Sequence, residues 1–388
     1  MSVTFIHTAD WQIGKPFAGI ADDTKRILVQ QERIKCVERI GGAAREHGAE
    51  FILVAGDLFD SPTPTRDTVA ATCAAIGGIG LPVLVIPGNH DHGGPGGVWE
   101  QSFFLGQRDQ RAPNLQVLLK PEPLELDTAV IFPCPLVRRH ETDDTTAWLR
   151  DLDLSRFGAK PRIVLAHGSV QGFTSDLDEE DLGGSRINRI ELDRLPAEGF
   201  DYVALGDWHG TKKMTATAWY SGTPEIDRFP KGEDNRPGHV LVVTAARGAP
   251  PEVVEARTAG LGWHPHTFSF AEDASLEVLK AELNGLFGAQ AQRDLLLLML
   301  NGSLGLGASA HLEERLEGWE AGLLRLKLAN NTTIAPTEEE VAALTQRAAD
   351  PLISRVAARL VEEARAENET GRIARLALRE LHAACADA

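Results

Sequence analysis

Five short hydrophobic runs in this chain are each followed by a side chain that can bind a hard metal ion. Apolar runs of four or five residues bounded by Gly, Pro and Asp are typical of buried β-strands. Ligands of an open α/β sheet bind outside the carboxyl ends of its strands, so the repetition predicts one shared metal site. The runs and their side chains are 3–7 before Asp10 and Gln12, 51–55 before Asp57, 83–86 before Asn89, His90 and Asp91, 163–166 before His167, and 202–205 before Asp207 and His209.

Helical patterns separate the first three runs. Residues 26–47 carry apolar side chains at helical spacing before Gly48, and a second helix is predicted over about 65–79. This alternation of strand and helix is typical of a parallel sheet built in layers. Short strands expected over 115–132, followed by the runs at 163 and 202, predict two sheets faced by helices.

The ligand-bearing pattern stops at about residue 244, and Gly-Ala-Pro-Pro at 248–251 predicts a domain boundary. We therefore expect a catalytic domain over 1–247 and a compact α+β cap over 248–335. In the cap, strands are predicted at 267–270 and 295–301 and a helix at 276–287. Residues 336–388 are rich in Ala, Glu, Arg and Leu, which predicts helices that either pack on themselves or dock to a partner.

Length and composition indicate an ordinary globular protein. The 388 residues suit a large domain with one or two smaller ones, and the 43% hydrophobic and 24% charged residues are typical of soluble chains. No run approaches the roughly 20 apolar residues that a membrane span needs, and the chain opens on a strand, so we expect a cytoplasmic protein. The four cysteines lack the spacing of a zinc cage or a disulfide framework.

The net charge of −17 argues against a broad basic surface that coats nucleic acid. Any DNA contact must therefore be local. Part of the negative charge belongs to the carboxylates of the predicted metal site, where bound cations would offset it. Lys212 and Lys213, just after the last ligand motif, are candidates for gripping a phosphate backbone, and the alternative is a role in surface solubility.

The side chains at the strand ends suit a two-metal site for phosphoryl transfer. In such sites two ions about 3.5–4 Å apart stabilise the attacking and leaving oxygens. Asp57 is expected to bridge the ions, Asp10 to anchor the first, and Asn89 and His167 to bind the second. Asp207 and His209 follow one strand and reach toward both ions. A hydroxide held between the cations would then attack phosphorus in line.

His90 is the one histidine of these motifs that we do not expect to bind metal. It follows Asn89 in a tight turn and is placed to face the substrate. An imidazolium there stabilises or protonates the leaving oxygen. Asp91 is expected to orient this imidazole.

The motifs Asp-x-Gln, Gly-Asp-x-x-Asp, Gly-Asn-His-Asp, Ala-His-Gly and Gly-Asp-x-His resemble the five motifs of the calcineurin-like metallophosphoesterases. Thr-Ala-Asp at 8–10, Gly-Asp-Leu-Phe-Asp at 56–60 and Tyr-Ser-Gly-Thr-Pro at 220–224 resemble the SbcD-type DNA repair exonucleases, including their YhaO-like branch. The resemblance covers about residues 1–245. It implies a four-layer αββα domain, two Mn²⁺ ions with Mg²⁺ as the alternative, and nuclease activity on DNA. It also implies homodimers and an SMC-like ATPase of the SbcC type bound through the C-terminal helices.

Two positions depart from the family pattern. Gln12 stands where a histidine normally binds the first metal, and Asp207 where a histidine normally binds the second. Each keeps an oxygen that can coordinate a cation, so we expect two metals with a preference for hard ions; the alternative is the loss of one metal. These departures also keep two other functions open, a phosphodiesterase or phosphatase for small phosphoesters and a metal-poor scaffold that holds the ATPase.

Overall fold

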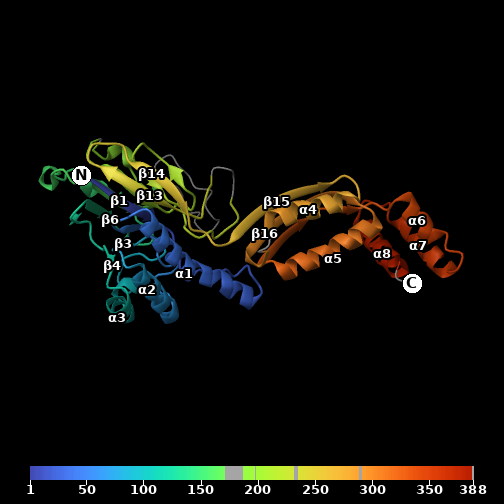
Figure 1. Ribbon diagram of the computed structural model, residues 1–388. Coiled ribbons are helices and arrows are strands. Elements are labelled where there is room, and N and C mark those ends of the chain that lie inside the picture. The colour runs from blue at the N-terminus through green and yellow to red at the C-terminus, as the bar shows by residue number, and fades with distance from the viewer. Residues whose placement is uncertain (171–186, 197, 231–234, 288–290, 387–388) are drawn as a thin grey trace. The chain divides into compact units, whose positions relative to one another are not determined.

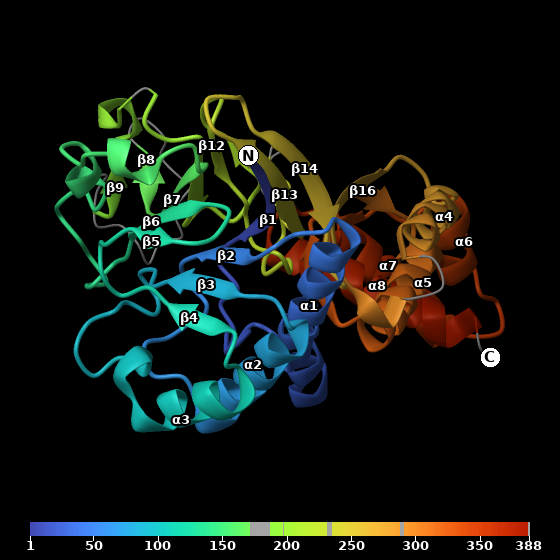
Figure 2. The ribbon, with the colours of Figure 1, turned by 60° about the vertical axis from the view of Figure 1, so that its left-hand side comes forward.

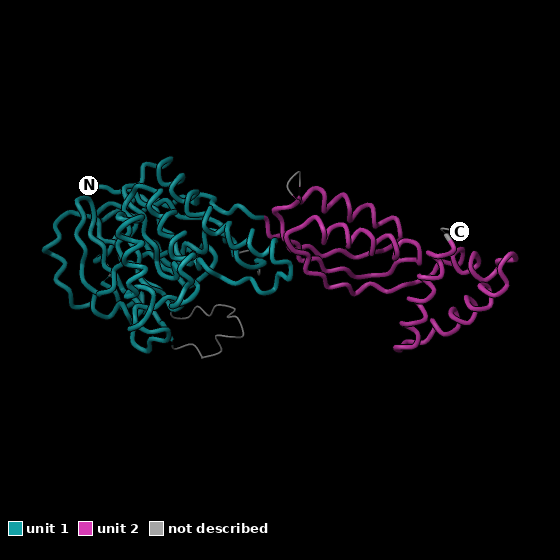
Figure 3. Tube along the Cα trace, turned by 90° about the horizontal axis from the view of Figure 1, so that it is seen from below, with its two compact units in different colours: residues 1–261 teal, residues 262–388 magenta. Residues whose placement is uncertain are grey.

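The computed structural model of the chain describes residues 1–170, 187–196, 198–230, 235–287 and 291–386. They form two compact units, Met1–Leu261 and Gly262–Ala388 (Figure 3). The Gly-Ala-Pro-Pro stretch, expected to mark the boundary, instead connects strand β13 (His239–Ala246) to its antiparallel partner β14 (Glu252–Arg257). The first unit therefore extends past residue 247 to Leu261.

The first unit contains two six-stranded sheets, of which the first has the order β14-β13-β1-β2-β3-β4. Strands β1 to β4 are parallel neighbours, and β13 is antiparallel to β1. Three helices lie along one face of this sheet (Figure 2). The elements are β1 (Ser2–Thr8), β2 (Ile52–Ala55), β3 (Val83–Ile86), β4 (Leu115–Val117), α1 (Asp23–Glu46), α2 (Arg66–Ile79) and α3 (Ser102–Arg111).

The local sequence explains where these helices begin and end. Asp22 caps α1 by accepting a hydrogen bond from the backbone of Lys25, and Thr65 caps α2 in the same way. Helix α2 ends at Gly80, whose left-handed backbone (φ 77°) other residues adopt only with strain. Both helices match the ranges predicted from the sequence closely.

The second sheet has the order β11-β12-β10-β7-β6-β5. In the described part of the chain, the outer face of this sheet is covered by short 3-10 segments at Ala147–Leu149, Ser155–Phe157 and Leu192–Arg194. Two sheets and one helical layer of the expected αββα arrangement are thus present. Among the described residues, the 3-10 segments take the position expected for the second helical layer. The strands are β5 (Leu124–Glu125), β6 (Val130–Cys134), β7 (Arg162–His167), β10 (Tyr202–Gly206), β11 (Lys212–Lys213) and β12 (Ala218–Tyr220), with a separate pair of β8 (Ser169–Val170) and β9 (Arg189–Ile190).

The two sheets pack face to face through a buried apolar cluster. Phe5 of β1 stacks on Phe51 and meets the edge of Tyr202 of β10, with ring centroids 5.3 and 5.6 Å apart. His7 joins the sheets by polar contacts, since its Nδ1 lies 2.9 Å from the Tyr202 hydroxyl and its Nε2 3.2 Å from the Leu205 carbonyl. Burial lowers the pKa of His7 to about 3, so this imidazole is neutral and serves the structure.

The second unit is built on parallel strands β15, β16 and β17, with β18 also pairing with β16 (Figure 1). The strands and helix predicted for the cap fall within β15, β16 and α4, whereas α5 and β17 were not predicted. The C-terminal segment is helical, as expected. The elements are β15 (Gly262–Phe270), α4 (Ser275–Phe287), β16 (Asp294–Leu304), α5 (Leu306–Gly322), β17 (Arg325–Asn330), β18 (Thr333–Ile334), α6 (Glu338–Thr345), α7 (Pro351–Glu363) and α8 (Glu369–Ala386).

None of the described helices combines the length and the apolar character that a membrane crossing requires.

Candidate metal centre

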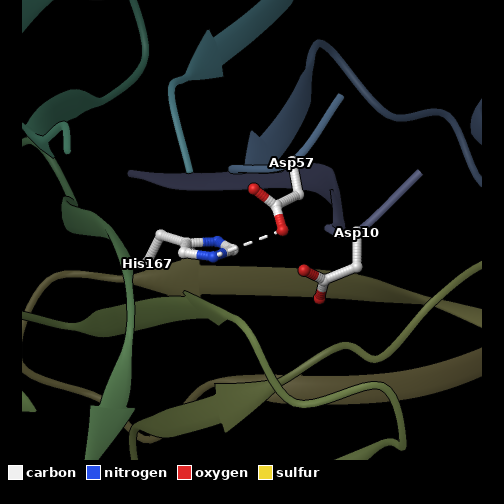
Figure 4. A group of neighbouring side chains, drawn as sticks. All are labelled: Asp10, Asp57 and His167. Carbon is white, nitrogen blue, oxygen red and sulfur yellow. Dashed lines mark ion pairs between the residues drawn. The ribbon is translucent and has the colours of Figure 1, made fainter. Parts of the chain in front are cut away.

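The carboxyl ends of strands from both sheets meet at one place. Asp10 follows β1, Asp57 follows β2, and His167 is the last residue of β7 (Figure 4). All three side chains are buried, and one ligand atom from each lies within 4.8 Å of the others. His167 Nε2 lies 3.7 Å from Asp57 Oδ2. Two carboxylates and one imidazole gathered without solvent form a donor set that fits a divalent cation.

The backbone around this group is strained. Asp10, Gln12, Asp57 and Asp207 have φ angles of 53°, 41°, 54° and 105°, in the left-handed region that side chains rarely adopt. Such strain persists only where the surrounding structure enforces it, and it gathers at functional sites. The backbone of Gly56 also lies very close to the His167 side chain, because a Cβ atom at Gly56 would be 2.2 Å from Nδ1 of His167. The glycine before Asp57 is therefore required by the site.

His167 is held in one tautomer. Its Nδ1 lies 2.8 Å from the carbonyl oxygen of Ala55 and donates a proton to it, so Nε2 faces the centre. There Nε2 lies 2.8 Å from Oδ1 of Asn89 and 3.8 Å from Oδ1 of Asp207. A neutral Nε2 and an amide oxygen are both acceptors. They face one another with a proton on Nε2 or with a cation bound to both atoms; otherwise the Asn89 amide turns its NH₂ group toward Nε2.

The electrostatics of this group favour a cation. Burial lowers the pKa of His167, but the carboxylates of Asp57, Asp10 and Asp207 raise it more strongly, to about 9. Burial also raises the pKa of Asp10 well above its usual range. The backbone N–H of Asp207 lies 3.2 Å from each oxygen of Asp10, and Ser169 donates to Oδ2 of Asp207 at 2.8 Å. These contacts are too few to neutralise the buried charge.

We call Asp10, Asp57, Asn89, His167 and Asp207 the His167 cluster. A second group, the His209 cluster, consists of Gln12, Lys15, His209, Asp227 and Arg228. It contains two of the predicted ligands, Gln12 and His209. The other three residues were not predicted.

The His209 cluster contains its own cations. Lys15 Nζ lies 2.9 Å from Oε1 of Gln12 and 2.7 Å from Oδ2 of Asp227. His209 Nδ1 lies 3.1 Å from the same Asp227 oxygen, and Arg228 Nε lies 3.4 Å from Oδ1 of Asp227. Burial would raise the pKa of Asp227, but His209, Lys15 and Arg228 hold it well below its usual range. Burial lowers the pKa of His209.

His90 lies beside the His167 cluster, where its backbone N–H donates to Oδ1 of Asp57 at 2.9 Å. The side chain is partly exposed, and its Nδ1 lies 3.0 Å from the carbonyl oxygen of Asp60 and 3.9 Å from Oδ1 of that residue. These contacts engage Nδ1 and not Nε2. Asp60, the last residue of the Gly-Asp-x-x-Asp motif, is thus the neighbour that orients His90.

Asp91 does not orient His90, contrary to our expectation. Its two carboxylate oxygens accept the backbone N–H groups of Gly88, at 2.8 Å, and Phe59, at 3.0 Å. Burial, followed by the charge of Asp57, raises the pKa of Asp91 to about 7. Asp91 therefore ties the loop after β3 to the loop after β2, and acts on the site through the backbone.

Arg33 of α1 supports the loop that carries Asp10 and was not predicted either. This buried guanidinium donates to the carbonyl oxygens of Trp11, Glu225 and Asp10, at 2.7, 3.1 and 3.2 Å, and to the Thr223 hydroxyl at 3.3 Å. A buried arginine with so many backbone partners fixes local geometry. From the sequence alone, Arg33 is one more polar residue of a helix and gives no signal.

Lys212 and Lys213 form the short edge strand β11. Their ammonium groups lie over aromatic rings, Lys212 over Trp208 at 5.7 Å and Lys213 over Trp219 at 5.2 Å. Trp208 lies between Asp207 and His209 in sequence, so Lys212 packs on a residue of the last ligand motif. Lys213 is exposed.

The sequence pattern of the calcineurin-like phosphoesterase family matches residues 3–211, more than half of the chain. Two crystal structures are similar at a low level. The protein TT1561 of Thermus thermophilus is 14% identical with a TM-score of 0.39, over 66% of this chain and 100% of its own. The other is 12% identical with a TM-score of 0.39, over 66% of this chain and 99% of its own.

Proposed function

The chain belongs to the calcineurin-like phosphoesterase family, and from that premise we propose that it is a metal-dependent phosphodiesterase that cleaves DNA, as the SbcD-type exonucleases do. Its phosphoesterase activity depends on a divalent metal. The observation that carries the proposal is the buried group of Asp10, Asp57 and His167 at the strand ends, with His90 beside it.

The His167 cluster supplies the residues that would hold a divalent ion, most suitably Mn²⁺ or Mg²⁺. When bound, such an ion polarises a phosphoryl oxygen and lowers the pKa of water. Asp57 takes part in two ways, through its carboxylate and by fixing the His90 backbone. His90 presents Nε2 toward the substrate side, because Asp60 engages its Nδ1. From there it donates a proton to the leaving oxygen.

DNA is the proposed substrate because the 8–10, 56–60 and 220–224 sequences resemble those of SbcD-type nucleases. Lys212, which lies over Trp208 of the last ligand motif, and its neighbour Lys213 supply local positive charge that suits contact with a phosphate backbone. The net charge of −17 restricts DNA to such local contacts. An SMC-like ATPase of the SbcC type, which would hold the DNA, is the proposed partner of the second unit.

The C-terminal helices are the proposed docking site for this ATPase. Helices α7 and α8 are amphipathic, and Leu352, Val356 and Ile373 expose apolar side chains. Apolar side chains on a helix face are suited to packing against another helix.

Small phosphoesters are the second candidate substrate, and the strongly negative charge favours them. A chromogenic diester separates the two candidates. If DNA is the substrate, it competes with the diester for the site and slows its hydrolysis. Hydrolysis of the diester that DNA does not slow would favour small phosphoesters.

The direct test is hydrolysis of single- and double-stranded DNA by metal-stripped protein supplied with Mn²⁺, Mg²⁺ or no ion. We expect ion-dependent cleavage that is lost in both Asp57→Ala and His90→Ala. Asp127→Ala is the matched control, since Asp127 is an exposed carboxylate between β5 and β6. Cleavage that survives in Asp57→Ala would contradict the proposed site.

A further inference from the structure

The orientation of the Gln12 side-chain amide is determined by its neighbour Lys15. Lys15 Nζ lies 2.9 Å from one end of the amide. An ammonium group has only donors, so this end must be the oxygen. The NH₂ group of Gln12 therefore faces Nε2 of His209, at 3.4 Å.

This orientation also determines the tautomer of His209. Nε2 must accept from the Gln12 amide, so the proton lies on Nδ1 and points to Oδ2 of Asp227 at 3.1 Å. An Arg228 nitrogen lies 2.9 Å from the same Nδ1, so each tautomer brings one pair of donors together. Nδ1–H faces Arg228 in the first tautomer, and Nε2–H faces the NH₂ group of Gln12 in the other. Only the first gives Lys15, Gln12, His209 and Asp227 complementary partners in a closed ring.

The closed ring engages the ligand atoms that Gln12 and His209 would offer to a metal ion. The Gln12 oxygen accepts from Lys15, its NH₂ group cannot bind a cation, and Nε2 of His209 is taken by that NH₂ group. The family resemblance assigns the position of Gln12 to the first ion, and His209 is expected to reach toward both ions. The arrangement of these two side chains does not fit either expectation. An ion on the Gln12 oxygen would also lie close to the Lys15 ammonium, and like charges repel.

We propose that this centre holds one divalent ion, in the His167 cluster, and that the Lys15 ammonium supplies the positive charge of the His209 cluster in place of a second ion. The inference rests on the metal-dependent part of the proposed function and does not depend on DNA as the substrate. It also gives a reason for Gln12: unlike a metal-bound imidazole, an amide offers one acceptor to Lys15 and one donor to His209.

The test is the number of Mn²⁺ ions bound per chain, measured by native mass spectrometry and elemental analysis of the full-length protein. The electron paramagnetic resonance spectrum distinguishes an isolated Mn²⁺ ion from a coupled pair. We expect one ion per chain and the spectrum of an isolated ion. Two ions, or none, would overturn the inference.

Variants of Lys15 test its role. The double substitution Gln12→His with Lys15→Met introduces the imidazole of the family pattern and removes the ammonium group. It should raise the number of bound Mn²⁺ ions from one to two per chain. Lys15→Arg keeps the charge and should keep one ion, as should the control Lys120→Met at an exposed lysine of the first unit. A folded double variant that still binds one ion would overturn the role of Lys15.

The wild-type count decides the inference even if the double variant fails to fold. One bound ion without DNA cleavage would support the single-ion centre and contradict only the proposed substrate. Two bound ions with DNA cleavage would support the proposed substrate and contradict the single-ion centre.

Discussion

The His167 and His209 clusters each contain a buried carboxylate, Asp10 in the first and Asp227 in the second. The pKa values of these two carboxylates are shifted in opposite directions. Burial raises the pKa of Asp10 well above its usual range, whereas His209, Lys15 and Arg228 overcome burial and hold the pKa of Asp227 well below it. The difference arises from the available donors. In the His209 cluster, Lys15 and Arg228 lie beside one carboxylate, whereas in the His167 cluster three carboxylates share one imidazole. Buried carboxylates that outnumber their cationic partners therefore indicate where an ion binds.

Asp57→Asn should break the His167 cluster with the largest effect. The substitution removes a buried negative charge at the centre of the site and should lower both Mn²⁺ affinity and phosphodiester cleavage by more than about 100-fold. Isothermal titration and a DNA cleavage assay would measure the two losses. Asp127→Asn serves as the matched control. A variant that binds Mn²⁺ as tightly as the wild type would show that Asp57 is not a ligand.

His90→Gln should separate chemistry from metal binding within the same region. A proton donor contributes about 100-fold or more to a reaction rate, so we expect that loss in the cleavage rate. Mn²⁺ affinity should be unchanged, because the His90 side chain is held by Asp60 outside the His167 cluster. Cleavage rates and Mn²⁺ titrations on one preparation test both statements. An equal loss of affinity would assign His90 to the metal.

A matched pair of histidine substitutions compares the clusters directly. His167→Gln removes a ligand from the buried centre and should lower Mn²⁺ affinity by about 100-fold or more, above the roughly 10–100-fold that the loss of an outer partner costs. His209→Gln should change the affinity by less than about threefold, which is below the range for even an outer partner of a ligand. Titration of both variants with Mn²⁺ gives the comparison. Equal losses would place an ion in each cluster.

The smallest expected effect is on stability against pH in the metal-free protein. The pKa of His167 is raised from 6.5 to about 9 in the folded state. The stabilisation from its protonation is therefore complete below pH 6.5 and is lost as the pH rises to about 9. We expect the thermal unfolding midpoint to fall over this window without metal.

Saturating Mn²⁺ should remove this pH dependence, because the ion replaces the proton. His167→Gln should flatten it even without metal. His209 does not contribute in this window, since burial lowers its pKa. A metal-free midpoint that stays constant or rises from pH 6.5 to about 9 would contradict the charge arrangement of the His167 cluster.

The sequence predicts the His167 cluster better than the His209 cluster for a physical reason. The residues of the first follow buried strands, and each apolar run fixes where its polar neighbour lies. Lys15 and Asp227 come from loops, whose paths depend on tertiary packing. A lysine three positions after Gln12 is a weak signal, and Asp227 gives none.

The same reason explains which parts of the fold are predictable from the sequence. Helices α1 and α2 have clear caps, strand β2 between them is a continuous apolar run, and the predicted ranges of all three hold. The sequence predicts a domain boundary at 248–251, inside the hairpin of β13 and β14, because Gly and Pro are found in both turns and linkers. Adjacency in sequence predicts that Asp91 orients His90, but Asp60 has this role. Within a tight turn, sequence neighbours need not be neighbours of the side chain.

The most direct test of the account is a crystal structure of the protein grown with Mn²⁺ and measured at a wavelength where manganese scatters anomalously. We expect one anomalous peak, within the His167 cluster of Asp10, Asp57, Asn89, His167 and Asp207, with Lys15 still bonded to Gln12. A second peak between Gln12 and His209, with Lys15 displaced, would contradict it.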